Sequence, residues 1–266
     1  MEEEAVKTLD RKIDFSRVKE KDIDEIETVE EVFDKFTLEA LYHVMRELRL
    51  ARLYGVISSG KEARVYRAID RSGREYAVKI YLTFTSEFKK GIWKYIMGDP
   101  RFERARIGTT RSLIAIWARK EFKNLQRLFR AGVRVPKPYG VKQNIVVMEF
   151  IGRSGVRAPL LKEQPPEEES EALKMFEKIM RNVWLSHCRA RLVHADLSEY
   201  NIMVYEGEPV IIDVGQAVLT DHPNAYEFLT KDLKNIQRYF EHEIGIKVPD
   251  VNELYEVIVE CRGTNT

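Results

Sequence analysis

The stretch HADLSEYN, residues 194–201, places an aspartate and an asparagine five positions apart in a polar segment that follows a long amphipathic pattern. The stretch IIDVG, which follows a hairpin-like pattern, adds Asp213. Phosphoryl transfer needs a base for the attacking oxygen and oxygen ligands for Mg²⁺. Asp196 is suited to act as the base, and Asn201 and Asp213 are suited to act as oxygen ligands of Mg²⁺. We interpret His194 as a structural residue, because the aspartate already provides the base.

A lysine inside an otherwise apolar strand pattern is the next candidate. In YAVKI, residues 76–80, strand alternation puts Ala77 and Lys79 on one face. A strand lysine that grips phosphates needs a carboxylate to hold it, and Glu121 is the only acidic residue within 105–147. We therefore predict an ion pair between Lys79 and Glu121. For the strand taken alone, a lysine whose ammonium reaches solvent is the alternative.

The segment SSGKEARV, residues 58–65, is a candidate phosphate loop. It resembles a P-loop, but Glu62 stands where a P-loop has a hydroxyl, and a β-patterned segment follows where a P-loop opens a helix. A kinase-type loop with three glycines and a valine instead aligns Ser58, Gly60, Ala63 and Val65, and it retains one of the three glycines. An ordinary hairpin turn is the alternative. The spacing to the strand lysine favours the phosphate loop.

The order of these patterns predicts an α+β protein with two lobes. We divide the chain into an acidic, partly helical extension over 1–50, a β-rich N-lobe with one helix over 51–148, and a reduced, mainly helical C-lobe over 149–266. Helices are expected from Thr37, which would be an N-cap, and at 112–132, 168–192, 223–243 and 250–261. Three antiparallel strands are expected within 54–82, and a buried strand that ends in a glycine bend is expected at 144–152. Residues 83–111 break the periodicity and are expected to form a flexible basic surface loop.

Composition narrows the classes of protein. Apolar residues at 44% and charged residues at 33% describe a globular protein, and no apolar run approaches the roughly 18 residues of a membrane span. Residues 1–40 hold 14 acids and 7 bases, which leaves +8 for the remainder of a chain with net charge +1. Cys188 and Cys261 form no CxxC pair and no signal-peptide pattern opens the chain, so we expect reduced cysteines, with Cys188 in the core, and a cytoplasmic location.

With these motifs assembled, the chain resembles the RIO family of atypical serine/threonine protein kinases, most closely its type-one, archaeal-like branch. The resemblance rests on SSGKEARVYRA, WARKEFKNLQRL, VVMEFIG, HADLSEYN, IIDVGQAV and HPNAYEFLTKDLKNI, over roughly residues 50–240. It implies a bilobal protein kinase-like fold. Only about 50 residues precede the phosphate loop, which argues against the type-two branch with its added winged-helix domain.

The resemblance also implies cofactors and their binding residues. It implies ATP and Mg²⁺, with Mn²⁺ as a substitute, and backbone recognition of adenine near Met148, Glu149 and Ile151. It implies catalytic roles for Lys79, Asp196 and Asp213 and a metal role for Asn201. The remaining implied nucleotide contacts are Ile57, Ser58, Gly60, Lys61, Glu62, Val65, Ala77 and Glu121.

Substrate and partner expectations follow from the same resemblance. DFG is replaced by Asp-Val-Gly, APE is missing, and 53 residues follow Asp213, so we expect no activation segment and no full set of peptide-docking helices. The family implies a protein serine/threonine acceptor or autophosphorylation, an aspartyl-phosphate at Asp213, and a role in maturation of the small ribosomal subunit and its RNA. A nucleotide-switched ribosome assembly module is the alternative. A small-molecule kinase of the aminoglycoside type is disfavoured by the short C-terminal part.

Overall fold

The computed structural model describes residues 13–14, 33–82, 86–102 and 108–261. The chain divides into two compact units, each described by itself. Unit 1 takes in the described residues within Met1–Phe88, Ala105–Phe122 and Lys137–Arg157, and unit 2 those within Lys89–Arg104, Lys123–Pro136 and Ala158–Thr266. The predicted N-lobe ends at Met148, whereas the last segment of unit 1 ends at Arg157. Two segments of the predicted N-lobe, Lys89–Arg104 and Lys123–Pro136, belong to unit 2. Most of the predicted acidic extension lies outside the described residues.

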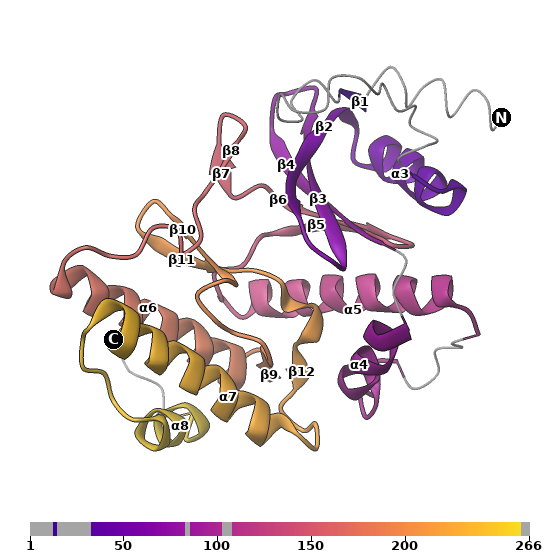
Figure 1. Ribbon diagram of the computed structural model, residues 1–266. Coiled ribbons are helices and arrows are strands. Elements are labelled where there is room, and N and C mark those ends of the chain that lie inside the picture. Colours follow the sequence, from indigo (N-terminus) through magenta and orange to yellow (C-terminus); the bar gives the residue numbers. More distant parts are fainter. Residues whose placement is uncertain (1–12, 15–32, 83–85, 103–107, 262–266) are drawn as a thin grey trace. The chain divides into compact units, whose positions relative to one another are not determined.

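Unit 1 is built on a six-stranded sheet in the order β1-β2-β3-β4-β6-β5 (Figure 1). Its strands are β1 Ile13–Asp14, β2 Leu50–Ser59, β3 Ala63–Asp70, β4 Glu75–Tyr81, β5 Pro138–Lys142 and β6 Ile145–Glu149. The strands β2, β3 and β4 pair antiparallel, which confirms the three predicted strands, and β1 pairs with β2 in parallel. The strand β6 joins β4 from far along the chain, opposite Tyr76 through Ile80.

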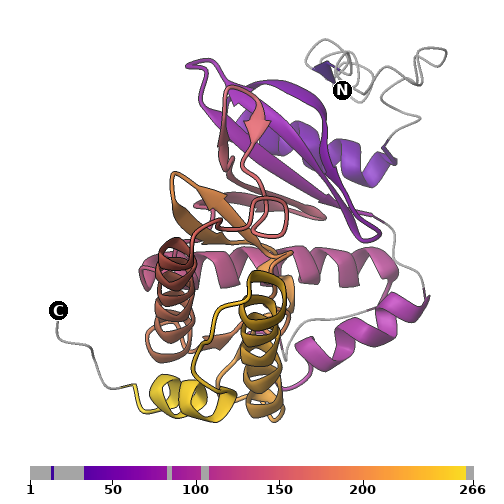
Figure 2. The same cartoon turned by 60° about the vertical axis from the view of Figure 1, so that its left-hand side comes forward.

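One face of this sheet forms the core of unit 1 against helix α3, Lys35–Glu47 (Figure 2). Tyr76, Val78 and Ile80 are buried there, as the strand alternation predicts. The predicted N-cap is wrong. The cap is Asp34, whose carboxylate accepts a hydrogen bond from the backbone N–H of Thr37. Thr37 is instead buried, and its hydroxyl oxygen accepts a hydrogen bond from the Asn144 side chain at 2.9 Å.

The segment predicted as a basic loop contains helix α4, Ser86–Ile96. Ile92, Tyr95 and Ile96 are buried, and the Tyr95 ring lies 5.4 Å from that of Phe228 within unit 2. The prediction was wrong because three apolar residues at helical spacing are enough to form one buried stripe when a partner helix is present. Positions 83–85 and 103–107 of the predicted loop lie outside the described residues.

The predicted amphipathic helix is confirmed as α5, Thr110–Arg130. The helix ends at Arg130, the chain leaves it through Gly132, whose φ of +84° is left-handed, and the N–H of Val133 returns to the Leu128 carbonyl at 3.1 Å. A short hairpin, β7 Gly152–Arg153 with β8 Val156–Arg157, follows the sheet and replaces the simple glycine bend that we expected.

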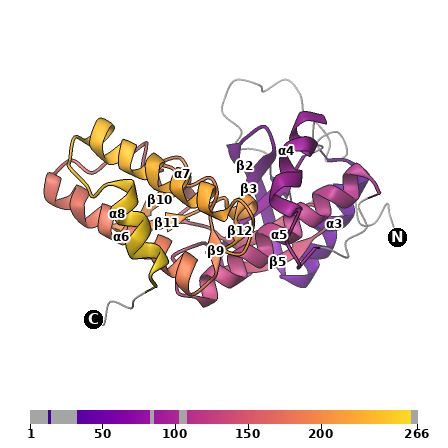
Figure 3. The same ribbon diagram turned by 90° about the horizontal axis from the view of Figure 1, so that it is seen from below.

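Unit 2 is mainly helical, and its described residues include two small strand pairs. Its elements are α6 Glu169–Cys188, β9 Leu192–Val193, β10 Ile202–Tyr205, β11 Glu208–Ile211, the 3-10 helix η1 Val214–Gln216, β12 Val218–Leu219, α7 Ala225–Arg238, the π-helix η2 Tyr239–Ile244 and α8 Val251–Val259. The predicted hairpin is confirmed as β10 with β11. The predicted helix over 168–192 ends earlier, and β9 pairs with β12. The helix α8 packs against both α6 and α7 (Figure 3).

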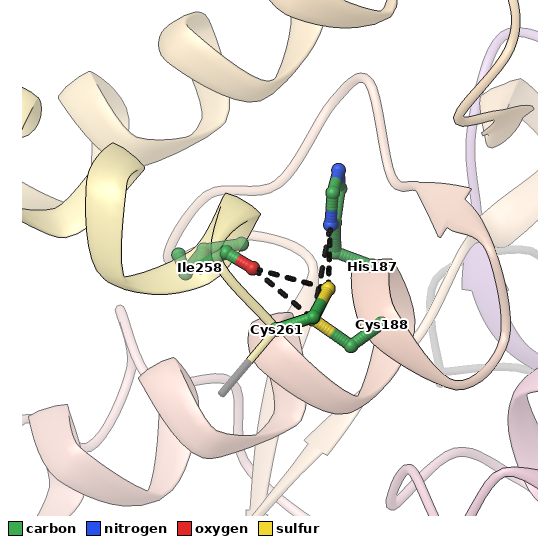
Figure 4. The surroundings of a disulfide bond; sticks show 4 residues. All are labelled: His187, Cys188, Ile258 and Cys261. Atoms are coloured by element: carbon green, nitrogen blue, oxygen red, sulfur yellow. Dashed lines mark hydrogen bonds between the residues drawn. A yellow bond between two sulfur atoms is a disulfide. The ribbon is translucent and has the colours of Figure 1, made fainter. Parts of the chain in front are cut away.

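Cys188 and Cys261 form a disulfide that joins the end of α6 to the segment after α8 (Figure 4). The expectation that both cysteines are reduced therefore differs from the structure, and Cys188 is half-buried rather than in the core. The pairing bridges 73 residues and depends on how α8 packs against α6, which no local pattern encodes.

Among the described residues, no helix combines the length and the apolar character that crossing a membrane requires.

Gly152 generates a stability prediction. Its φ is +153°, and a Cβ there would meet the Val156 carbonyl oxygen at 2.2 Å and the Arg157 Cα at 2.8 Å. Both are backbone atoms, so the hairpin would have to shift. We expect Gly152→Ala to lower the free energy of unfolding by more than about 2 kcal/mol in urea denaturation. The control is Gly91→Ala in α4, where no described atom lies within 4 Å; it should be neutral or slightly stabilising. Equal effects of the two variants would contradict the steric argument.

Candidate active site

The predicted ion pair between Lys79 and Glu121 is confirmed within unit 1. The ammonium nitrogen of Lys79 on β4 lies 2.8 Å from Oε1 of Glu121 on α5, and their side chains are 9% and 1% exposed. The hydroxyl of Tyr81 donates to the other carboxylate oxygen, Oε2, at 2.5 Å. A buried charge is tolerated when it is paired and hydrogen-bonded, so the pair fixes the ammonium on one face of the sheet.

Several predicted nucleotide contacts share that sheet face. Val65 pairs with Lys79, and Ala77 pairs with Met148, so the registers place these four side chains on the face opposite the α3 core. Ser58 pairs with Val65 at the start of the hairpin. The strand alternation alone had brought together only Ala77 and Lys79.

The candidate phosphate loop is a tight hairpin turn between β2 and β3. A hairpin turn was the alternative that the sequence left open for this segment. The N–H of Gly60 donates to the Ala63 carbonyl at 3.0 Å, and the Glu62 carbonyl accepts from Leu82 at 2.9 Å. Gly60 has no left-handed φ, and an added Cβ would make only an ordinary 3.6 Å contact. Folding therefore does not require glycine at this position. The side chains of Ser58 and Lys61 are exposed and that of Ile57 is half-buried.

Of the residues expected near the adenine, Met148 and Glu149 end β6 and Ile151 follows it. The N–H of Glu149 donates to the Lys137 carbonyl at 2.8 Å, and its carboxylate accepts from the Lys137 N–H at 3.1 Å. An adenine contact from Glu149 would therefore have to come from its carbonyl. Met148 and Ile151 are buried.

The HADLSEYN segment of unit 2 is held through its backbone by helix α7. The N–H groups of Ala195 and Leu197 donate to the two carboxylate oxygens of Asp232, both at 2.8 Å. The side-chain amide of Asn235 donates to the Leu197 carbonyl at 3.0 Å. Ala195 itself has a left-handed φ of +67°, a conformation that persists only when its surroundings enforce it. Asp196, between the two anchored N–H groups, is thereby held in place.

Sequence reasoning missed Asp232, although a signal was present. It occupies the apolar stripe of α7 with Leu229, Leu233 and Ile236, and all four are buried. An acidic residue within a buried stripe needs dedicated partners. Burial raises the pKa of Asp232 to about 8, against the effect of its two N–H donors.

The Asp196 carboxylate is half-exposed and has donors on both oxygens. The amide of Gln216 donates to Oδ2 at 3.2 Å, and the Lys231 ammonium lies 3.6 Å from Oδ1. Asn201 uses its Nδ2 to donate to the Asp196 carbonyl at 2.8 Å, which leaves Oδ1 as the acceptor end of its amide. An amide oxygen beside carboxylates is the type of ligand that Mg²⁺ prefers, so the residues fit a magnesium ion.

Asp213 follows β11 in a left-handed conformation, with φ of 57°, and is exposed. The segment around it is tied to the polar loop: the N–H of Ile212 donates to the Asn201 carbonyl at 2.9 Å, and Nε2 of His194 lies 3.0 Å from the Ile212 carbonyl oxygen. The structural interpretation of His194 agrees with this contact.

A second residue that sequence reasoning missed is Asn124. It is fully buried on α5, and its amide nitrogen donates to the carbonyls of Val214 at 2.8 Å and Ala217 at 3.0 Å. A polar residue on the buried face of an amphipathic helix was the available signal. The segment after Asp213 is thereby fixed within unit 2.

The structure thus assembles two groups of predicted residues, each inside one unit. Lys79 and Glu121 meet in unit 1, and the segments of Asp196, Asn201 and Asp213 are joined by hydrogen bonds in unit 2. Their convergence on one triphosphate stays a prediction.

Comparisons with known proteins agree with this geometry. The RIO domain family model matches residues 64–254. The Rio1 serine/threonine-protein kinase of the archaeon Haloferax volcanii is 41% identical over 96% of this chain and 85% of its own length. Rio1 of Methanocaldococcus jannaschii is 39% identical over 83% of this chain and 74% of its own length. Human RIO1 is 37% identical over 96% of this chain, which spans 44% of that relative.

Solved structures show the same fold. The Rio2 kinase of Chaetomium thermophilum aligns with a TM-score of 0.65 and 21% identity, over 86% of this chain and 69% of that one. A second crystal structure of that kinase, a complex with ADP, Mg²⁺ and phosphoaspartate, aligns with a TM-score of 0.61 and 22% identity, over 83% and 66%. The predicted α+β, protein kinase-like fold is confirmed. The chain belongs to the RIO family of serine/threonine protein kinases, in its Rio1 branch.

Proposed function

We propose that this chain transfers the γ-phosphoryl group of ATP, with Mg²⁺, to a serine or threonine hydroxyl or, in ATPase turnover, to water. The buried Lys79–Glu121 pair is the observation that carries the proposal, because a strand ammonium held by a helix carboxylate has the arrangement that phosphate binding in kinases requires. Bound ADP and Mg²⁺ in the related Rio2 kinase support the choice of cofactors. Mn²⁺ would suit the same oxygen ligands.

Each residue has a role in the proposed transfer. The Lys79 ammonium contacts the α- and β-phosphates, and the hairpin turn at Gly60 lies over the phosphates. The acceptor oxygen bonds to the γ-phosphorus, the bond from that phosphorus to the bridging oxygen breaks, ADP leaves, and Asp196 receives the hydroxyl proton. Asn201 and Asp213 would hold Mg²⁺, which neutralises charge on the phosphate oxygens when bound. Gln216 and Lys231 orient the Asp196 carboxylate.

ATPase turnover has a covalent route through Asp213. A carboxylate oxygen of Asp213 would attack the γ-phosphorus with loss of ADP, and water would then release phosphate and restore the carboxylate. The exposure of Asp213 and the phosphoaspartate in the related Rio2 complex support this route.

We further propose that the partner is the precursor of the small ribosomal subunit and its RNA. Only residues 214–224 lie between Asp213 and α7, which leaves little chain for an activation segment that would dock a peptide substrate. This observation favours an additional role as a nucleotide-switched assembly module. The excess of +8 outside residues 1–40 suits an RNA partner. A pure switch would bind particles in a nucleotide-dependent way without turnover, which distinguishes the two roles.

A cytoplasmic location, without a membrane partner, is part of the proposal. ATP as the phosphoryl donor and ribosomal particles as partners support it. The disulfide does not oppose it, since intracellular proteins of some heat-adapted organisms contain disulfides.

The base assignment is tested with Asp196→Ala. We expect turnover of ATP to fall at least about 100-fold while ATP affinity changes little, because the base is lost and the phosphate contacts remain. Turnover is measured with radiolabelled ATP and affinity by calorimetry. Asp221→Ala, an aspartate whose side chain is 82% exposed, is the control and should behave as the unmodified chain. Undiminished hydrolysis in Asp196→Ala would rule out the assignment.

The ion pair is tested by a double-mutant cycle with Lys79→Met and Glu121→Gln. Each single change should lower kcat/KM for ATP by roughly 30-fold or more, which corresponds to about 2 kcal/mol, because the buried pair is broken. The double variant should lose much less than the product of the two, since both act through one contact. Multiplicative losses would show that the pair does not act as a unit.

The raised pKa of Asp232 predicts the pH dependence of stability. Its pKa is about 8 in the folded chain against an ordinary 3.8, so the folded state retains a proton that the unfolded state releases between these values. Its contribution to the free energy of unfolding is therefore fully present below about pH 4 and declines as pH rises to 8, by up to about 1.4 kcal/mol per pH unit. Asp232→Asn should show a flatter decline in urea denaturation from pH 5 to 7.5. Parallel curves would mean that Asp232 is ionised throughout.

A further inference from the structure

Three potential metal ligands gather where helices α6 and α8 end in unit 2 (Figure 4). Nδ1 of His187 lies 3.9 Å from Sγ of Cys188 and 3.8 Å from Sγ of Cys261. The Ile258 carbonyl oxygen lies 3.1 Å and 3.6 Å from the same two sulfurs. All three side chains are half-buried, so small solutes have access to them. The kinase chemistry proposed above uses none of these residues.

Two helix ends supply partial negative charge at the cluster, and the positive charge of Arg191 near His187 acts against it. The helix α6 ends at Cys188, and α8 ends at Val259, so the carbonyl-rich, partially negative ends of two helices meet at the cluster. Ile258 belongs to the last turn of α8, where carbonyls have no partner within the helix. A thiolate at a helix C-terminus is disfavoured unless positive charge compensates it. The two cysteines are therefore expected there as a disulfide, as neutral thiols, or as thiolates whose charge a bound metal ion compensates.

We propose that His187, Cys188 and Cys261 form a Zn²⁺ site when the cysteines are reduced, and that this site and the disulfide are two states of one redox-sensitive device. Two thiolates and an imidazole are a donor set that Zn²⁺ prefers. Tetrahedral zinc, with bonds of about 2.0 to 2.3 Å, separates neighbouring ligand atoms by roughly 3.5 to 3.8 Å. The distances from His187 to the two sulfurs are already close to that range, so mainly the sulfurs have to move apart. Water or the Ile258 carbonyl completes the fourth position.

The two states interconvert by balanced chemistry. A low-molecular-weight disulfide oxidant accepts two electrons from the two thiolates, the bond between Cys188 and Cys261 forms, and Zn²⁺ is released while the oxidant takes up two protons and leaves as two thiols. Either state ties α8 to α6. In a reducing compartment, paired cysteines are more often metal ligands than disulfides, so the zinc state is the one expected there.

The experiment uses the full chain, reduced with dithiothreitol and freed of reductant under nitrogen, with Zn²⁺ or Co²⁺ as the probe. We expect one Zn²⁺ per chain in competition with a metallochromic chelator, a rise in Tm on adding Zn²⁺, and sulfur-to-metal charge-transfer absorption with Co²⁺. His187→Gln, Cys188→Ser and Cys261→Ser should each weaken binding at least about tenfold. The control is His242→Gln, which changes an exposed histidine on η2 and should bind as the unmodified chain does.

The His187→Gln variant also separates a loss of zinc binding from a loss of folding. It retains both cysteines, so its oxidised form can be checked for an unchanged Tm before reduction. Oxidised glutathione should release the bound Zn²⁺ from the unmodified chain and form the disulfide. The proposal is overturned if the reduced chain binds no more Zn²⁺ than Cys188→Ser, or if His187→Gln binds with undiminished affinity and the same Co²⁺ spectrum. None of these readouts depends on kinase activity.

Discussion

The buried ion pair between Lys79 and Glu121 sets the main constraint on this chain. Both side chains are removed from water, and neither would be stable there alone, because an unpaired buried charge costs several kcal/mol. The pair therefore commits β4 and α5 to a single arrangement in unit 1. Tyr81 completes the arrangement by occupying the second carboxylate oxygen. The sheet face that results carries Val65, Ala77 and Met148 beside the ammonium, and Arg67 also faces this side because it pairs with Ala77.

In unit 2, buried polar side chains outside the HADLSEYN loop fix its backbone, although the loop itself is polar. The buried Asp232 accepts hydrogen bonds from the N–H groups of Ala195 and Leu197, and the buried Asn124 donates to carbonyls of the segment after Asp213. These contacts go to backbone atoms, and two side chains of the loop add to them, since His194 contacts the Ile212 carbonyl and Asn201 donates to the Asp196 carbonyl. Asp196 is thus positioned through the backbone on both sides of it. This arrangement agrees with the general rule that reactive groups are precise only when their supporting contacts are satisfied.

The contact between the end of α6 and the segment after α8 adds a third fixed point, and Cys188 precedes the HADLSEYN segment closely in the chain. The disulfide between Cys188 and Cys261 and the zinc state inferred for the same atoms use identical side chains to join the same two helices. The C-terminal helix is thereby retained under oxidising and reducing conditions alike. A helix of nine residues has little stability alone, so the covalent or metal link to α6 stabilises the position of α8.

The sequence by itself determined the elements with local signals. Strand alternation assigned the faces of β4, the 3.6-residue period placed α5, and the lone acidic residue within 105–147 identified the partner of Lys79. The spacing of Asp196, Asn201 and Asp213 indicated the chemistry, and the family resemblance was confirmed.

Only the tertiary structure decided the rest. The helix α4 was missed because its charged residues masked a narrow apolar stripe whose stability comes from packing within unit 2. The roles of Asp232 and Asn124 and the Cys188–Cys261 bond each join atoms whose proximity depends on how elements pack. Local patterns encode which faces are buried, whereas the partner of a buried polar group is set by which other chain segment reaches it.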